Sequence, residues 1–124
     1  MFISGGLGQD GQILTVLFKK KKNNLNIFYK GKKPKTTKGV NFIRENLLNK
    51  KKLDLFFKKK KPDIVLHLAA NNPSYHEKNY KVFFKDNFLA TKNIFYSTFE
   101  ANKKTKIIFF YLVKIFKKKN WFCK

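Results

Sequence analysis

Short apolar runs alternate along the chain with segments in which apolar residues recur at helical spacing between lysines. The runs predict about five strands, at residues 1–4, 25–29, 40–43, 63–68 and 106–110, the last extending to about residue 113 in its longest form. The periodic segments predict helices at residues 12–22, 48–60 and 80–100. Because strands and helices take turns, we expect an α/β fold in which a parallel sheet carries helices on both faces.

The same pattern indicates which side chains form the core. The first helix is expected to face the sheet through four apolar residues, Ile13, Leu14, Leu17 and Phe18. The second carries Leu53, Phe56 and Phe57 on one face and lysines on the other, which is typical of a surface helix. The almost unbroken aliphatic run at residues 63–68 favours a central strand that is buried on both faces.

The chemically most informative segment is the glycine-rich turn at residues 4–11, Ser-Gly-Gly-Leu-Gly-Gln-Asp-Gly. Gly5, Gly8 and Gly11 are evenly spaced in it, directly after the first strand and before the first helix. In that position backbone N–H groups and the helix dipole face an anion, and the missing Cβ atoms let a pyrophosphate come close. An ordinary glycine-rich turn is the alternative, and the order of strand, turn and helix argues against it.

This turn resembles the Thr/Ser-Gly-x-x-Gly-x-x-Gly turn of the extended short-chain dehydrogenases/reductases, the sugar-nucleotide epimerases and dehydratases. Gly-Gln-Asp-Gly at residues 8–11 is similar to the same turn of GDP-mannose 4,6-dehydratases. His-Leu-Ala-Ala at residues 67–70 resembles the end of the family's fourth strand, and residues 87–93 resemble its Asn-x-x-Gly-Thr-x-Asn helix, with Ala90 replacing the glycine. The resemblance covers residues 1 to about 110 and implies the N-terminal part of a Rossmann-type fold.

The resemblance also implies which residues contact a nucleotide cofactor. The pyrophosphate would lie against the glycine turn, at Gly5, Gly8, Gln9, Asp10 and Gly11. The ribose and the nicotinamide would lie against the end of the fourth strand, at Leu68, Ala69, Ala70 and Asn71. Asn46-Leu47 falls where the family has Asp-Leu near the adenine, so the acceptor oxygen is kept and the charge is lost. A role of Asn46 as a helix N-cap or turn residue is the alternative.

The choice between NAD and NADP depends on the end of the second strand, where NAD enzymes place an acidic residue and NADP enzymes place bases. Lys30, Lys32 and Lys33 follow that strand here, and no acidic residue does. NADP is therefore the expected cofactor and NAD the less favoured one, as in the dehydratases that the chain resembles. A solvated lysine loop is the alternative, because lysines are frequent throughout the chain.

The catalytic residues of the family have no counterpart in the sequence. The family places Ser/Thr at the end of its fifth strand, where residues 111–113 are Tyr-Leu-Val, and the single Tyr-x-x-x-Lys match, Tyr29 and Lys33, lies in the wrong part of the fold. We therefore expect no catalytic residue, an incomplete Rossmann domain over residues 1–113 and an unplaced basic tail over residues 114–124. An interrupted reading frame is the hypothesis for this ending, and sugar-nucleotide binding and homo-oligomers are expected of a full-length form alone.

The charge balance keeps a second class of function open. The 124 residues carry 29 Lys plus Arg against 7 Asp plus Glu, a formal net charge of +22, with Arg44 as the single arginine. Such a field attracts anions, so a basic nucleic-acid-binding module is the alternative function. Base-specific contacts favour arginine, however, and we expect no contact with nucleic acid beyond non-specific charge.

The remaining residues indicate the compartment and exclude other chemistry. Cys123 is the single cysteine, so no internal disulfide can form and a cytoplasmic location is expected. No apolar stretch reaches the roughly 20 residues that a membrane-spanning helix needs, and a basic peripheral membrane protein is the least supported interpretation. His67 is expected to be a packed histidine, and His76, Glu77 and Asp86 lack metal-ligand spacing, so we expect no metal site.

Overall fold

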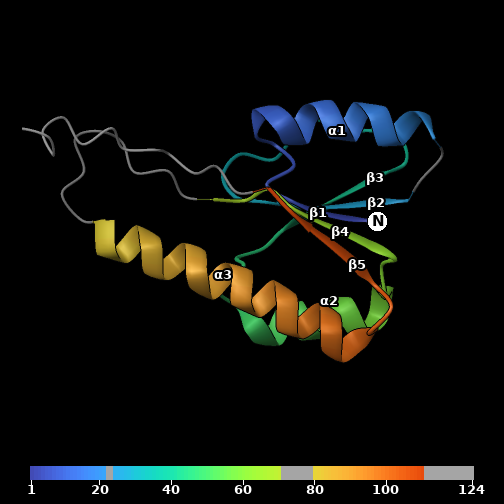
Figure 1. Ribbon diagram of the computed structural model, residues 1–124. Helices are drawn as coiled ribbons and strands as arrows, with labels where there is room; N and C mark the ends of the chain where they lie inside the picture. Colours follow the sequence, from blue (N-terminus) through green and yellow to red (C-terminus); the bar gives the residue numbers. More distant parts are fainter. Residues whose placement is uncertain (22–23, 71–79, 111–124) are drawn as a thin grey trace, which may run out of the picture.

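The structure, a computed structural model, describes residues 1–21, 24–70 and 80–110. In these residues five parallel strands form one sheet in the order β3-β2-β1-β4-β5 (Figure 1). The strands are β1 (Phe2–Ser4), β2 (Leu25–Tyr29), β3 (Val40–Arg44), β4 (Ile64–His67) and β5 (Lys106–Phe109). β1 lies at the centre, where Ile3 pairs with Ile27 of β2 and Leu66 of β4. The predicted α/β fold with a parallel sheet is confirmed.

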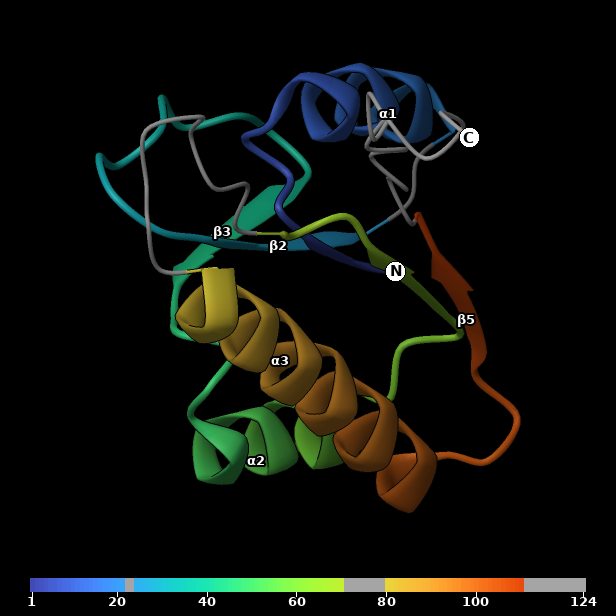
Figure 2. The ribbon, with the colours of Figure 1, turned by 60° about the vertical axis from the view of Figure 1, so that its left-hand side comes forward.

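Three helices in the described ranges cover the two faces of the sheet. They are α1 (Gln9–Lys20), α2 (Lys50–Lys60) and α3 (Tyr80–Ala101). α1 lies on one face, whereas α2 and α3 lie together on the other (Figures 1 and 2). This arrangement confirms the prediction of helices on both faces. Since α1 follows β1 and α3 follows β4, both helices begin at the edge of the sheet where these strands end.

Alternate residues of the central strands supply two hydrophobic layers, because neighbouring side chains of a strand point to opposite faces. Toward α2 and α3, the Phe2 ring lies 5.0 Å from the Phe57 ring and 4.9 Å from the Phe28 ring, measured between centroids. The layer toward α1 combines aliphatic strand residues with two residues of α1: Ile3, Ile27, Leu66, Leu14 and Phe18. Burial on both faces explains why these strands are almost continuously apolar.

The observed apolar face of α1 is narrower than the predicted one. Leu14 and Phe18 pack against the sheet as expected, but Ile13 and Leu17 are 56% and 51% exposed. Because Leu14 and Phe18 are four residues apart, they form a narrow stripe along one side of α1. Among the described helices, α1 alone covers this face of the sheet (Figure 2). The prediction that Ile13 and Leu17 face the sheet was therefore wrong.

Capping residues set helix boundaries that differ from the predicted ones. α1 begins at Gln9 rather than at residue 12, because Gly8 adopts an extended conformation as its N-cap. α2 begins at Lys50 rather than at residue 48, because the Asn49 side chain accepts a backbone hydrogen bond in the first turn. The apolar face predicted for α2 is confirmed by three buried or partly buried residues, Leu53, Phe56 and Phe57.

β5 lies at one edge of the sheet and ends at Phe109. The Phe110 N–H still donates to the His67 carbonyl oxygen at 3.3 Å, so strand pairing continues for one residue. Ile108 and Phe109 are 46% and 41% exposed. The edge strand is therefore much less covered than the central strands.

Several predictions fall outside the described residues. They concern Asn71, His76, Glu77, residues 111–113 and the basic tail at residues 114–124, which includes Cys123. Within the described ranges, no helix combines the length and the apolar character needed to cross a membrane. The His, Cys, Asp and Glu residues of the same ranges form no group of three that could hold a metal ion.

Candidate functional site

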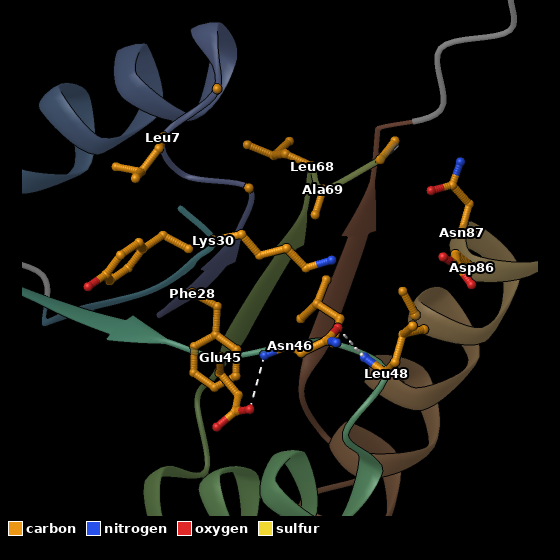
Figure 3. A pocket seen from close by; sticks show the side chains of 16 residues that line it. Leu7, Phe28, Lys30, Glu45, Asn46, Leu48, Leu68, Ala69, Asp86 and Asn87 are labelled. Carbon is orange, nitrogen blue, oxygen red and sulfur yellow. Dashed lines mark hydrogen bonds between the residues drawn. The ribbon is translucent and has the colours of Figure 1, made fainter. Parts of the chain in front are cut away.

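A cavity of about 280 Å³ opens where β1, β2 and β4 end (Figure 3). Its walls come from the glycine turn, the end of β2 with the residue after it, the loop that follows β3, the residues that follow β4 and the first half of α3. Most residues predicted to contact a cofactor line it, namely Gly5, Gly8, Lys30, Asn46, Leu47, Leu68, Ala69 and Ala70. In open parallel sheets, ligands bind at this carboxyl edge of the strands.

The glycine turn packs directly onto the end of β4. Gly5 has a φ of +73°, and its carbonyl oxygen accepts a hydrogen bond from the Gly8 N–H at 3.0 Å. A Cβ atom on Gly5 would lie 2.7 Å from the Ala69 nitrogen and 2.8 Å from the Ala69 Cα. Both the backbone conformation and the close approach therefore require glycine at this position.

Gly8 and Gly11 have different surroundings. Gly8 lines the cavity, and an added Cβ atom there would meet the Gly5 carbonyl oxygen alone, at 3.3 Å. At Gly11 an added Cβ atom would lie 2.5 Å from the Gly5 oxygen and 2.5 Å from the Gly6 Cα. Gly11 is buried and does not line the cavity. It lets α1 pack on the turn, whereas Gly8 leaves room at the cavity.

The start of α1 places backbone donors beside the cavity. The first helical hydrogen bond runs from the Gln12 N–H to the Gly8 carbonyl oxygen at 2.9 Å, so the N–H groups of Gln9, Asp10 and Gly11 precede it. These groups carry the positive end of the helix dipole. Gln9 and Asp10 are exposed and do not line the cavity.

The loop between β3 and α2 forms the wall opposite the glycine turn (Figure 3). Asn46 Oδ1 accepts a hydrogen bond from the Leu48 N–H at 3.1 Å, and the Asn46 N–H donates to Glu45 Oε1 at 3.0 Å. Asn46 is therefore a turn residue, while Asn49 is the N-cap of α2. The turn role does not remove Asn46 from the cavity wall.

Two contacts hold this loop against the helices. Asn93 Nδ2 on α3 donates to the carbonyl oxygens of Leu47 at 3.0 Å and Leu48 at 3.3 Å. Glu45 Oε2 lies 3.2 Å from Lys52 Nζ on α2, and 13% of the Glu45 side chain is exposed. The shape of the cavity therefore depends on α2 and α3 as well as on the glycine turn.

Lys30 is the member of the predicted basic cluster that lines the cavity. It follows Tyr29, the last residue of β2, and its side chain extends toward the other lining residues in Figure 3. Lys32 and Lys33 are exposed and do not line the cavity. Tyr29 is the last residue of β2, and Lys33 lies in the loop after it.

His67 lies at the end of β4, directly before the residues that line the cavity. Its Nδ1 is 2.6 Å from Ser4 Oγ, and its Nε2 is 2.9 Å from Thr91 Oγ1. The residue is 5% exposed, and burial lowers the pKa of the imidazole from 6.5 to about 4. His67 is therefore neutral near pH 7. Its burial confirms the prediction of a packed histidine.

Sequence reasoning missed several residues that line the cavity: Leu7, Phe28, Tyr29, Glu45, Leu48, Asp86, Asn87 and Ala90. Half of them adjoin a predicted residue in the chain. Asn87 and Ala90 belong to the helical segment that resembles the family, and their spacing of three places them on one face of α3. That spacing is the pattern that could have assigned both residues to the site.

Comparison with known proteins identifies one family whose sequence profile matches most of the chain. Residues 1–116 match the sequence profile of the NAD dependent epimerase/dehydratase family. No curated protein sequence gives a significant match. Among solved structures, the UDP-Glc/GlcNAc 4-epimerase of Campylobacter jejuni is similar with a TM-score of 0.76 and 21% identity, over 87% of this chain and 35% of that chain.

Two further solved structures share the fold. The UDP-glucose 4-epimerase of Thermotoga maritima has a TM-score of 0.76 and 17% identity, over 87% of this chain and 36% of its own. A monomeric L-threonine 3-dehydrogenase from a metagenome has a TM-score of 0.71 and 22% identity, over 86% of this chain and 34% of its own. The chain thus spans about a third of the length of these proteins. By its sequence profile, the chain belongs to the NAD dependent epimerase/dehydratase family.

Proposed function

We propose that the cavity binds a nicotinamide dinucleotide and that the chain is the cofactor-binding part of a sugar-nucleotide dehydratase or epimerase. The observation that carries this proposal is the packing of Gly5 against Ala69, which brings the start of α1 and the end of β4 to one cavity. Backbone N–H groups at a helix start can bind a pyrophosphate, and the adjoining strand end can support the neighbouring ribose.

The described residues fit such a cofactor in three regions. The turn at Gly8 would face the pyrophosphate, the loop at Asn46 and Leu47 the adenine, and Ala69 and Ala70 the nicotinamide side. The volume of about 280 Å³ lies just below the range of roughly 300–1,000 Å³ for small-molecule pockets, so the cavity would enclose part of the dinucleotide. When bound, the nicotinamide supplies hydride transfer, while the residues of this chain bind and orient it.

Lys30 supports a preference for NADP over NAD. It stands at the end of β2, where NADP enzymes place a base beside the 2′-phosphate. The acidic Glu45 follows β3 instead and pairs with Lys52. NAD is the competing cofactor, because a Bordetella bronchiseptica enzyme and the UDP-glucose 4-epimerase of Thermus thermophilus, both of similar fold, are solved in complex with NAD.

The turn sequence supports a narrower assignment within the family. Gly-Gln-Asp-Gly at residues 8–11 favours an enzyme similar to GDP-mannose 4,6-dehydratase. Because the chain spans about a third of its structural relatives, we propose catalysis, sugar-nucleotide binding and homo-oligomers for a longer protein that contains it, and cofactor binding without catalysis for the chain alone. The single cysteine supports a cytoplasmic location.

A titration of the purified chain with NADPH and NADH, followed by nucleotide fluorescence, tests the cofactor preference. We expect saturable binding that is about tenfold tighter for NADPH, and Lys30→Glu should abolish the difference because the base near the 2′-phosphate is lost. Lys38→Glu makes the same charge change at an exposed position outside the cavity and should keep the preference. An equal loss of the NADPH preference in Lys30→Glu and Lys38→Glu would show that overall charge, rather than Lys30, selects the nucleotide.

Gly8→Val tests the position of the site in the same titration. The valine side chain would occupy space at the cavity, so binding of both nucleotides should weaken about tenfold or more. Loss of the glycine N-cap should lower the free energy of unfolding by about 1 kcal/mol, which leaves the chain folded for the measurement. No saturable binding of either nucleotide by the unmodified chain would overturn the proposed function.

A further inference from the structure

We propose that Ser4, His67 and Thr91 form a hydrogen-bonded relay that positions the floor of the dinucleotide site, with His67 as its positioning residue. The inference rests on the proposed function and concerns how that same site keeps its shape. Ser4 Oγ lies 2.6 Å from His67 Nδ1, and Thr91 Oγ1 lies 2.9 Å from His67 Nε2. The relay thus connects the end of β1, the end of β4 and the middle of α3.

Each member of the relay adjoins a residue that lines the cavity. Ser4 precedes Gly5, His67 precedes Leu68 and Thr91 follows Ala90. Each relay residue is therefore joined to a cavity-lining residue by one peptide bond. A displacement of its side chain would move that part of the cavity wall. The Leu68 N–H also donates to the Ser4 carbonyl oxygen at 3.1 Å. This hydrogen bond extends the pairing of β1 and β4 to a residue that lines the cavity.

One arrangement of donors and acceptors uses every polar atom of the relay. The Ala69 N–H donates to Ser4 Oγ at 3.4 Å, and the Ser4 hydroxyl can then donate its own hydrogen to His67 Nδ1. With Nδ1 as an acceptor, the ring hydrogen is on Nε2 and is donated to Thr91 Oγ1. We assign the neutral Nε2–H tautomer, because it is the arrangement in which the buried Ser4 hydroxyl hydrogen is also used. The relay begins at Ala69, whose nitrogen would lie 2.7 Å from a Cβ atom added to Gly5.

Burial makes this geometry hard to change. Ser4 and His67 are 0% and 5% exposed, and the Phe109 ring packs edge-on against the imidazole with centroids 5.7 Å apart. A relay member that lost its partner would leave a buried polar atom unsatisfied, which is costly. The low pKa of His67, about 4, keeps the imidazole neutral near pH 7.

Ser4→Ala tests the relay in the nucleotide titration. It removes the hydroxyl, and we expect the dissociation constant for NADPH to rise about tenfold, equivalent to about 1.4 kcal/mol. Ser4→Thr keeps the Oγ atom and should restore the affinity to within about threefold of the unmodified chain, a difference well under 1.4 kcal/mol. These expectations hold at a temperature where circular dichroism shows each variant to be folded.

Ser97→Ala is the matched control. Ser97 is 1% exposed and donates to Asp54 Oδ1 at 2.5 Å. Ser97→Ala therefore also removes a buried hydroxyl hydrogen bond, but one that connects α2 and α3. Ser97 does not line the cavity. We expect a lower melting temperature and an unchanged dissociation constant. An equal loss of affinity in Ser97→Ala and Ser4→Ala would mean that general destabilisation, not positioning, explains the effect, and would overturn the relay.

The ¹⁵N NMR signals of His67 provide a readout that needs no nucleotide. We expect the Nε2–H tautomer in the unmodified chain and in Ser97→Ala, and a mixture of tautomers in Ser4→Ala. A dominant Nδ1–H tautomer in the unmodified chain would overturn the relay. So would equal NADPH affinity of Ser4→Ala and the unmodified chain, which would leave the proposed function intact. An unmodified chain that binds neither nucleotide would overturn both.

Discussion

Single residues of the glycine turn have separate roles. Gly5 permits a positive φ and a close contact with Ala69, Gly8 borders the cavity, and Gly11 lets α1 approach the turn. The sequence pattern assigned all of them to the cofactor, because spacing alone does not show which missing Cβ atom faces a ligand and which faces the protein. Substitutions should therefore separate binding from stability.

Gly11→Ala should destabilise the fold. The added Cβ atom would lie 2.5 Å from backbone atoms of Gly5 and Gly6, which cannot move without shifting the turn. We expect a loss of about 2 kcal/mol or more in the free energy of unfolding, despite the better helix propensity of alanine. Denaturant titration measures the loss, and Lys19→Ala, at an exposed position of α1, should change stability by less than about 0.5 kcal/mol. Equal midpoints for the two variants would contradict the packing role of Gly11.

Acid should destabilise the folded chain through His67. Burial lowers the pKa of its imidazole from 6.5 to about 4, and its contacts Ser4, Thr91 and Phe109 carry no charge. The unfolded chain therefore takes up a proton below pH 6.5 that the folded chain takes up near pH 4. The free energy of unfolding should therefore decrease by about 3 kcal/mol as the pH drops from 6.5 to about 4. Chemical denaturation across this range measures the fall, which His67→Asn should reduce.

Asp54 titrates in a separate range. Burial disfavours its carboxylate, but hydrogen bonds from Lys50 and Ser97 outweigh that effect and lower its pKa below 3.8. Its contribution to stability is therefore lost as the pH falls below 3.8, after His67 has titrated. A free energy of unfolding that stays constant down to pH 4 would contradict the account of His67.

At the scale of elements, the sequence predicted the strands and helices well and their boundaries less well. Apolar runs such as β4 and lysine-bounded periodic segments such as α2 are strong patterns, because both follow from burial. The helix starts depended instead on the caps Gly8 and Asn49, whose local conformations have weaker patterns. The cavity wall at Leu47 depends on Asn93, which is 46 residues away in the chain, so no local pattern could place it.

Asn93→Ala should loosen that wall. It removes the hydrogen bonds to the Leu47 and Leu48 carbonyl oxygens, and we expect a loss of about 1–2 kcal/mol in stability together with weaker NADPH binding. Asn41→Ala is the control, because Asn41 Nδ2 donates to Asn26 Oδ1 at 3.0 Å in a pair that does not line this cavity. Thermal unfolding and nucleotide titration measure both effects. Equal NADPH affinity in the two variants would contradict a role of Asn93 in the site.

At the scale of the whole molecule, a strongly basic chain exposes many large apolar side chains. Phe84 and Phe88 of α3 are 71% and 59% exposed, Val16 of α1 is 56% exposed, and Ile108 of β5 is 46% exposed. The net charge of +22 opposes contact between copies through repulsion, whereas exposed apolar surface favours it. The balance between these two effects should depend on salt.

We therefore expect the isolated chain to self-associate as the salt concentration rises. Salt screens the repulsion between lysine-rich surfaces and leaves apolar attraction in place. Sedimentation velocity across a salt series measures the association, and Phe84→Ser should reduce it because it removes the most exposed of these rings. A monomer that persists at high salt would contradict this expectation.

The most direct test of the proposed dinucleotide site is a ¹H–¹⁵N NMR titration of the chain with NADPH. We predict that the largest amide shifts occur where β1 and β4 end, at Gly5, Gly8 and Ala69, and saturate together with those of Asn46. Such a pattern would place the nucleotide between the glycine turn and the loop after β3. Shifts spread over the lysine-rich surfaces without saturation would indicate attraction by charge alone and would contradict the central claim.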